Sequence, residues 1–141
     1  MLNTMPDLWP TDIEISVEDA TVPVVILRQQ ASLLGEKTRN LVQGEIVTKP
    51  EPEFSTMNPK TRLVHRFYLN VATVDNYRYE LLKVSHGLEG YPVLIHTVHE
   101  GSETNVECSS PEEFTQALGT ILSSSQTLRI VRTLMAQAVN A

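Results

Sequence analysis

The stretch that decides the fold runs from residue 62 to residue 86 and reads RLVHRFYLNVATVDNYRYELLKVSH. Residues 62–74 alternate with a period of two, which is typical of a β-strand. One face of this strand carries Leu63, Phe67, Leu69 and Val71. Asp75 and Asn76 tolerate positive φ and predict a tight reversal, after which residues 77–86 return as an antiparallel strand. The stretch therefore predicts a long β-hairpin.

Three more strands are expected around this hairpin, at residues 41–48, 92–98 and 104–108. Residues 49–61 contain Pro50, Pro52 and Pro59 and are expected to form a loop, because proline lacks the N–H that a strand ladder uses. Strands that follow one another along the chain with short connections predict an antiparallel meander.

Helices are expected before and after the strands along the chain. Before it, Pro23 opens an apolar stripe with helical spacing. The stripe consists of Val24, Leu27, Ala31, Leu34, Thr38 and Leu41. After the sheet, Ser110 and Pro111 predict the start of one helix, and residues 123–125 separate it from a second. The predicted fold class is α+β: an N-terminal helix, an antiparallel meander sheet of about five strands, and two C-terminal helices packed on one sheet face.

Length and composition indicate one domain. The chain has 141 residues, of which 41% are hydrophobic and 20% charged, as in ordinary globular domains. We expect residues 22–141 to form a single α+β domain. Residues 1–21 are expected to form an acidic N-terminal arm, either as a short edge strand through Ile13, Ile15 and Val17 or as an extended arm held by Trp9. The expected buried core includes Leu27, Leu34, Phe67, Leu69, Leu118 and Leu134.

Charge and cysteine content point to a cytoplasmic setting. The net charge of −6 disfavours a nucleic-acid partner, since phosphate binding needs a surplus of lysine and arginine. The single cysteine, Cys108, cannot form an internal disulfide. The longest fully apolar run, residues 22–27, is far below the ~20 residues of a membrane helix, so no membrane partner is expected. The N-terminus lacks the features of a signal peptide.

Several stretches resemble a group of small uncharacterised bacterial cytoplasmic proteins with no assigned function. The first two are residues 26–42 (ILRQQASLLGEKTRNLV) and residues 75–79 (DNYRY). The likeness continues at residues 85–87, 91–93 and 112–137, so that it spans roughly residues 22–138. The resemblance implies a bacterial cytoplasmic protein, and it brings no catalytic or binding residue with it.

Motifs for familiar chemistry are missing from the sequence. Neither GxGxxG nor GxxxxGK[ST] occurs, which argues against common nucleotide enzymes, and no cofactor is expected. His96 and His99 do not have the paired spacing of a zinc site, and no metal site is expected. Cys108 precedes a helix start, where the helix dipole can lower a thiol pKa. A catalytic pairing of Cys108 with His86 is therefore one reading, and a buried structural thiol is the favoured one.

The candidate binding residues are aromatic and basic side chains of the hairpin, together with one histidine. They are Tyr68, Tyr77, Arg78, Tyr79 and His86. Tyrosines beside an arginine are typical of recognition surfaces. The alternative is that these tyrosines cap one edge of the core and hydrogen-bond to the backbone.

Two functions follow as hypotheses. The leading one is a small acidic interaction protein that binds another protein as an adaptor, inhibitor or assembly factor. The other is a small enzyme or ligand-binding domain with a pocket between sheet and helices that uses His65, His86 or Tyr79. Both faces of the hairpin contain apolar residues, the second face through Val64, Tyr68, Ala72 and Val74. We therefore also expect a homodimer through the sheet or its edge, with the arm contributing.

Overall fold

The computed structural model describes residues 5–14, 21–53, 60–99 and 101–141. In chain order the elements are α1 (Pro23–Lys37), β1 (Gln43–Pro52), β2 (Thr61–Val71), β3 (Tyr77–His86), β4 (Val93–His99), β5 (Ser102–Cys108), α2 (Pro111–Leu122) and α3 (Ser125–Val139). The strands form one antiparallel sheet in the order β1-β2-β3-β4-β5, so each strand pairs with the next along the chain. The α+β fold class expected from the sequence is confirmed.

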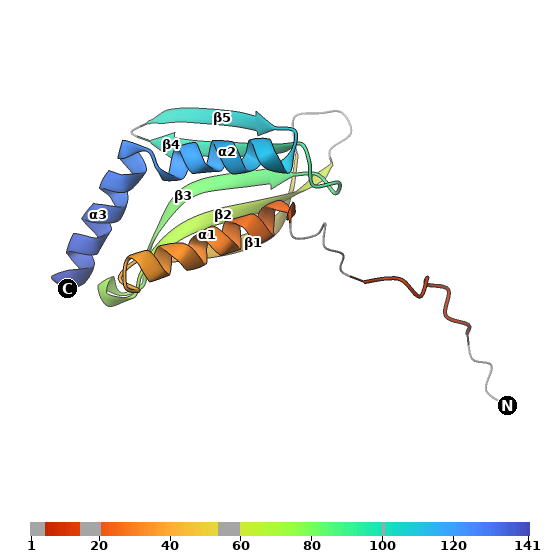
Figure 1. Cartoon of the computed structure of the whole chain (residues 1–141), viewed down its shortest axis with the longest axis horizontal. Coiled ribbons are helices and arrows are strands. Elements are labelled where there is room, and N and C mark those ends of the chain that lie inside the picture. The colour runs from red at the N-terminus through yellow and green to blue at the C-terminus, as the bar shows by residue number, and fades with distance from the viewer. Residues whose placement is uncertain (1–4, 15–20, 54–59, 100) are drawn as a thin grey trace.

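Helices α1 and α2 lie side by side over the same side of the sheet, which we call the covered face (Figure 1). Helix α1 packs mainly against β1 and α2 against β5, while α3 packs near the hairpin end of β2. Between helices and sheet lies one hydrophobic core. Its largest fully buried side chains include Leu27, Phe67, Leu69, Leu82, Ile95 and Phe114. The opposite side of the sheet is called the outer face below.

Alternation along β2 divides its side chains between the two faces. Phe67, Leu69 and Val71 are buried in the core on the covered face, as the sequence predicted. The register then shows which residues of the neighbouring strands point to the covered face, because paired residues of a ladder share a face. Ile46 of β1 and Leu82 of β3 both pair with Phe67. The period of two therefore places Phe67, Leu69 and Val71 correctly. In contrast, Leu63, expected on the same face, is 37% exposed near the start of the strand, and Val64, expected on the opposite face, is buried.

The ladder between β2 and β3 shifts register beside Phe67. Phe67 pairs with Leu82, whereas Tyr68 pairs with Glu80, so Leu81 is an extra residue on β3. A β-bulge of this kind interrupts the alternation of side chains. Leu81 and Leu82 are both buried although they are consecutive.

The prediction of a loop over residues 49–61 is wrong in its first part, because strand β1 continues to Pro52. Pro50 pairs with Leu63 and Pro52 with Thr61. Because β1 is an edge strand, only one of its sides needs backbone donors. Two prolines that are two residues apart direct their nitrogens to the same side, and the open side of an edge strand needs no N–H there. The remainder of the expected loop at residues 54–59 lies outside the described residues.

The hairpin reversal is longer than the expected two-residue turn. Strand β2 ends at Val71, and a 3-10 turn follows at Ala72–Val74. Asp75 and Asn76 then adopt φ values of 52° and 55°, which confirms the positive φ expected of them. Ala72 and Val74 thus lie in the turn rather than on the sheet, so the outer face is less apolar than the sequence suggested.

Helix α1 ends at Lys37 instead of continuing to Leu41. Arg39 and Asn40 have φ values of 53° and 64°, which lie in the left-handed region and stop the helix. The chain then returns as β1 directly beneath α1. A Cβ on Gly44 would lie 2.6 Å from the Ala31 Cα, so the close approach of strand and helix requires glycine at this position.

The C-terminal helices begin where their caps predict. The Ser110 hydroxyl accepts a hydrogen bond from the Glu113 N–H at 3.2 Å, and the Glu113 carboxylate accepts one from the Ser109 N–H at 2.6 Å. Ser124 caps α3 in the same way by accepting from the Thr127 N–H at 3.2 Å. Such reciprocal bonds satisfy donors that have no partner inside the helix.

Most of the expected core is buried, with one exception. Leu27, Phe67, Leu69, Leu118 and Leu134 are buried, whereas Leu34 is only half-buried. Residues 5–14 of the arm contain neither helix nor strand, and Trp9 is 75% exposed, so in this conformation it does not hold the arm against the domain. The expected strand at Ile15 and Val17 lies outside the described residues. No helix of the described residues is long and apolar enough to cross a membrane.

Candidate functional site

An open apolar groove lies where α1, α2 and α3 meet over the sheet. Its volume is about 320 Å³. Phe67, Leu69 and Leu81 of the sheet contribute to its lining. The helices contribute Gln30, Leu33, Leu34, Lys37, Gly119, Leu122, Ser123, Thr127 and Val131. Leu33, which is 43% exposed, adds apolar surface at the edge of the groove.

The hydroxyl groups of the groove are already engaged within the fold. The Ser123 hydroxyl donates to the Gly119 carbonyl at 2.6 Å, and the Thr127 hydroxyl donates to the Ile121 carbonyl at 2.7 Å. Small-molecule sites usually direct a few polar groups at the ligand to fix its orientation. This groove instead offers mainly apolar surface, which suits a hydrophobic side chain better than a polar substrate.

The candidate residues Tyr68 and Arg78 lie together on the outer face. The Arg78 guanidinium lies 4.0 Å from the centroid of the Tyr68 ring, within the range of a cation–π contact. Arg78 also forms an ion pair with Glu45 at 3.4 Å. These contacts join side chains of three neighbouring strands, β1, β2 and β3.

The other two candidate tyrosines lie apart from this pair. Tyr79 is half-buried and packs against the hydrophobic core. Tyr77 is exposed and lines a shallow apolar hollow beside Leu134 of α3. The sequence placed Tyr77 and Tyr79 on one strand face and Arg78 on the other, and the positions agree with that. The structure does not bring the candidate residues together into one site.

The fifth candidate, His86, forms a buried pair with His65. Their rings stack with centroids 4.9 Å apart, and the two Nε2 atoms are 2.7 Å apart. The exposed fractions are 6% for His86 and 2% for His65. Thr48 of β1 lies 2.7 Å from the His65 Nδ1, and the Gly87 carbonyl lies 2.7 Å from the His86 Nδ1.

The hydrogen-bond partners of the two histidines determine which ring nitrogens carry a hydrogen. The Gly87 carbonyl can only accept, so the His86 Nδ1–H donates to it and the His86 Nε2 accepts from the His65 Nε2–H. The His65 Nδ1 then accepts from the Thr48 hydroxyl. All four ring nitrogens have partners within the fold, so neither ring presents a free nitrogen to a substrate.

Burial makes this pair sensitive to acid. The pKa of His65 is lowered from 6.5 to about 4, chiefly because burial disfavours the charged ring, with further contributions from His86 and Arg28. Two Nε2 atoms 2.7 Å apart cannot both carry hydrogen and still bond. The native arrangement therefore requires that the pair is not doubly protonated.

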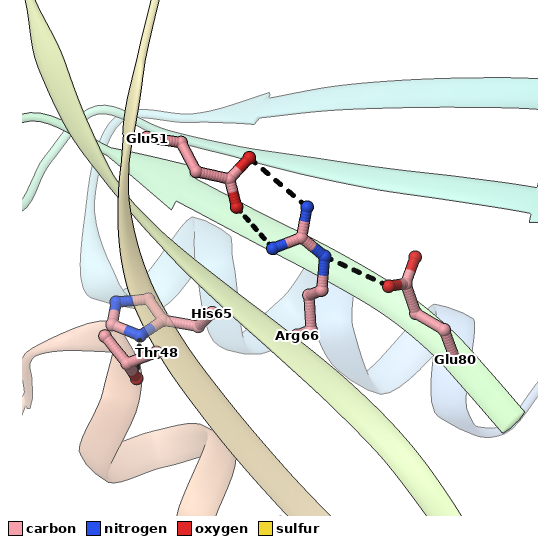
Figure 2. A network of polar contacts seen from close by, with 5 residues as sticks. All are labelled: Thr48, Glu51, His65, Arg66 and Glu80. Atoms are coloured by element: carbon pink, nitrogen blue, oxygen red, sulfur yellow. Dashed lines mark hydrogen bonds and ion pairs between the residues drawn. The ribbon is translucent and has the colours of Figure 1, made fainter. Parts of the chain in front are cut away.

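Arg66 forms a charged cluster on the outer face, opposite to His65. Its guanidinium donates two hydrogen bonds to the Glu51 carboxylate, and its Nε lies 3.1 Å from Glu80. Figure 2 shows Arg66 between these two acids, while His65 turns away from them toward Thr48. The hydrogen bond from Arg66 lowers the pKa of Glu51. One guanidinium is thus shared by two carboxylates, and the ion pairs connect three strands.

Cys108 is buried at the end of β5. Burial raises the pKa of its thiol, and Glu113 and Glu107 add to the shift. His86 and Cys108 both pair with Val93, so two strand spacings separate them, about 10 Å. A Cys108–His86 pairing is therefore not formed, and the thiol has the surroundings of a structural residue.

His96 makes its contact within the sheet: its Nδ1 lies 2.7 Å from the Asn105 side-chain oxygen on β5. Across residues 5–14, 21–53, 60–99 and 101–141, no three His, Cys, Asp or Glu side chains converge as a metal ion requires.

The ligand-binding hypothesis expected a pocket between sheet and helices, but it named His65, His86 or Tyr79, and none of these three residues lines the groove. One signal in the sequence pointed to the lining. Leu33 and Leu34 are consecutive on α1, and only Leu34 belongs to the predicted apolar stripe. A second leucine beside the stripe widens the apolar surface of the helix beyond what one core contact needs. The partners of Leu33 on α2 and α3 could not be identified without the packing of three helices.

Comparisons of this chain with protein-family models, with curated proteins and with solved structures found no match.

Proposed function

We propose that this chain is a non-enzymatic, cytoplasmic interaction module that holds a protein partner by apolar side chains in the groove between α1, α2 and α3. The observation that supports the proposal is an open groove of about 320 Å³ whose hydroxyl groups are already bonded within the fold. An adaptor, inhibitor or assembly factor works through a surface of this kind.

The chemistry of the groove favours a protein partner over a small substrate. An apolar pocket that takes one or two large side chains is the usual anchor of a protein interface. The histidines that the enzyme hypothesis needs are buried and bonded to one another outside the groove. The cytoplasmic setting is proposed because the single cysteine cannot form an internal disulfide.

Selection of binding peptides provides the test. Twelve-residue peptides displayed at random would be selected on the purified chain, and their affinities measured by fluorescence anisotropy. We expect enriched peptides to carry a large apolar or aromatic residue, with dissociation constants in the range of roughly 1–100 μM that a single anchor supports.

Two variants locate the binding. Leu33→Asp charges the edge of the groove, and Gly119→Leu fills it, since a Cβ on Gly119 meets no atom within 4 Å. Both should weaken the selected peptides at least tenfold. Leu88→Asp, on a side chain that is 97% exposed in the β3–β4 connection, is the matched control for charge. Thr120→Leu, the exposed neighbour of Gly119, is the control for added volume.

Peptides that bind Gly119→Leu as tightly as the unaltered chain would exclude the groove as their site. An enrichment of peptides without any apolar anchor would likewise contradict the proposal.

A further inference from the structure

The N-terminal arm exposes an unusual amount of apolar surface. Among residues 5–14 the side chains of four large apolar residues are at least 62% exposed: Met5, Leu8, Trp9 and Ile13. Figure 1 shows this segment extending away from the helices and the sheet. So much apolar surface on ten residues is typical of a segment that docks elsewhere, because burying it is favourable.

We propose that this arm folds back and places Trp9 in the groove of its own chain. The inference rests on the proposed function, since it names the segment that regulates access to the same groove. An occupied groove excludes the partner, and a partner must displace the arm in order to bind.

The groove has the size that a tryptophan side chain needs. A closed cavity of about 150 Å³ holds one benzene molecule. The groove measures about 320 Å³, which leaves room for the larger, two-ring indole. Its apolar lining suits the indole rings, and its open side allows the indole N–H to reach water.

The connection between arm and domain is long enough for this contact. Trp9 stands 14 residues before Pro23, where α1 begins, and these residues span up to about 46 Å when extended. The α1 side of the groove, from Gln30 to Lys37, lies about 10–21 Å along the helix from Pro23. The connection is therefore longer than the distance along α1 that Trp9 has to cover to reach the groove.

Charge favours the same contact. Residues 5–14 contain three acids, Asp7, Asp12 and Glu14, and no basic residue. Lys37, in the last turn of α1, stands at the groove. Opposite charges beside an apolar anchor orient a docking segment and raise the rate at which it finds its site.

Effective concentration favours the arm of the same chain over the arm of a second copy. A short covalent connection holds its two ends at an effective concentration in the millimolar range. A second copy at micromolar concentration competes at a disadvantage of roughly a thousandfold. The partner that displaces the arm should share its chemistry: an aromatic or large aliphatic residue flanked by acidic residues.

Intrinsic fluorescence tests the contact directly, because Trp9 is the only tryptophan of the chain. In the full chain we expect a blue-shifted emission and weak quenching by acrylamide. Gly119→Leu, which fills the groove, should shift the emission to the red and raise the quenching constant at least twofold. Thr120→Leu should leave both values unchanged, and circular dichroism confirms that each variant is folded.

A fully exposed emission in the unaltered chain, insensitive to Gly119→Leu, would overturn the inference. Light scattering distinguishes the two sources of the arm. A mass of 15.8 kDa together with concentration-independent fluorescence supports the own arm. Twice that mass with concentration-dependent fluorescence would overturn it in favour of a second copy, as the sequence-based homodimer prediction requires.

Competition separates this inference from the proposed function. Trp9→Ala removes the internal competitor, so a peptide selected for the groove should bind this variant roughly tenfold more tightly. Met5→Ala, four residues away on the same arm, is the control and should change the affinity less. Equal peptide affinity for Trp9→Ala and the unaltered chain would overturn the docking of the arm and leave the groove itself established as a binding site.

Discussion

His65 and Arg66 are neighbours in sequence, yet β2 directs them to opposite faces of the sheet (Figure 2). On the covered face, His65 is buried and takes part in a chain of hydrogen bonds between Thr48 and Gly87. On the outer face, Arg66 keeps its charge and binds Glu51 and Glu80.

The difference between His65 and Arg66 shows two ways in which one strand accommodates a basic side chain. Where water is excluded, the ring gives up its proton, because a buried charge without a counter-ion is unfavourable. Where water is near, the charge persists and is matched by carboxylates at small net gain. The covered face should therefore respond strongly to mutation and pH, and the outer face weakly.

The largest effect on the free energy of unfolding is expected on the covered face, and two adjacent residues of β2 on opposite faces test this. Phe67→Ala on the covered face should lower the free energy of unfolding by about 3–5 kcal/mol, because it removes a fully buried ring. Tyr68→Ala on the outer face should cost about 1 kcal/mol through the loss of its contact with Arg78. Urea unfolding measures both, and similar costs would contradict the division of the faces.

The second effect is the loss of stability in acid. The unfolded His65 takes up a proton near pH 6.5, whereas the folded one does so only near pH 4. The unfolded state thus binds more protons between these values, so the contribution of His65 to stability falls as the pH falls from about 7 to 4 and levels off below. A shift of this size corresponds to about 3 kcal/mol.

His65→Gln isolates this contribution, because it removes the titrating ring and keeps a polar side chain. The difference in unfolding free energy between the unaltered chain and the variant should change across this pH window. His96→Gln, at a half-buried histidine of β4, is the control and should follow the unaltered chain. A constant difference between pH 7 and pH 4 for His65→Gln would show that His65 is not held neutral.

A smaller effect is expected at Cys108, at the far end of the covered face. Cys108→Ser should cost about 1–3 kcal/mol, because a buried hydroxyl loses its hydrogen bonds to water. Binding of the selected peptides should be unchanged. Since burial raises the pKa of the thiol, iodoacetamide at pH 6.5 should label native Cys108 far more slowly than the unfolded chain. Rapid labelling with loss of binding would favour a reactive thiol.

The smallest effect is expected at Arg66. Arg66→Met should cost no more than about 1 kcal/mol in low salt, and the cost should shrink as salt screens the partly exposed ion pairs. Unfolding at low and high ionic strength measures this dependence. A cost of several kcal/mol that persists in high salt would mean that the outer face is protected from water, as a sheet-to-sheet dimer would require.

Much of the secondary structure could be predicted from short-range signals. The boundaries of β3 and the starts of α1 and α2 follow from residues such as Asn76, Pro23 and Ser110, whose effects act within a few residues. Pro50 and Pro52 misled the prediction for β1, because their tolerance depends on the position of β1 at the edge of the sheet. That position is a property of the whole sheet.

The candidate site was less predictable than the elements that carry it. Tyr68 and Arg78 meet across β2 and β3, a contact that the sequence did not predict, and His86 lies on the other side of the sheet with His65. A pocket between sheet and helices was one of the two hypotheses, but its lining residues were not identified, since they come from three helices and the sheet. A surface made of such distant segments has no contiguous pattern in the chain.

The sequence by itself determined the order of helices and strands, the face that the hydrophobic residues of β2 present, and the reversal at Asp75 and Asn76. These depend on periodicity, caps and backbone preferences, which are local. Only the tertiary structure decided that His65 and His86 bond to each other and that an apolar groove remains open. Both depend on register and packing: the extra residue Leu81 in β3 and the longer turn set which side chains meet. The positions of α1, α2 and α3 decide what remains uncovered.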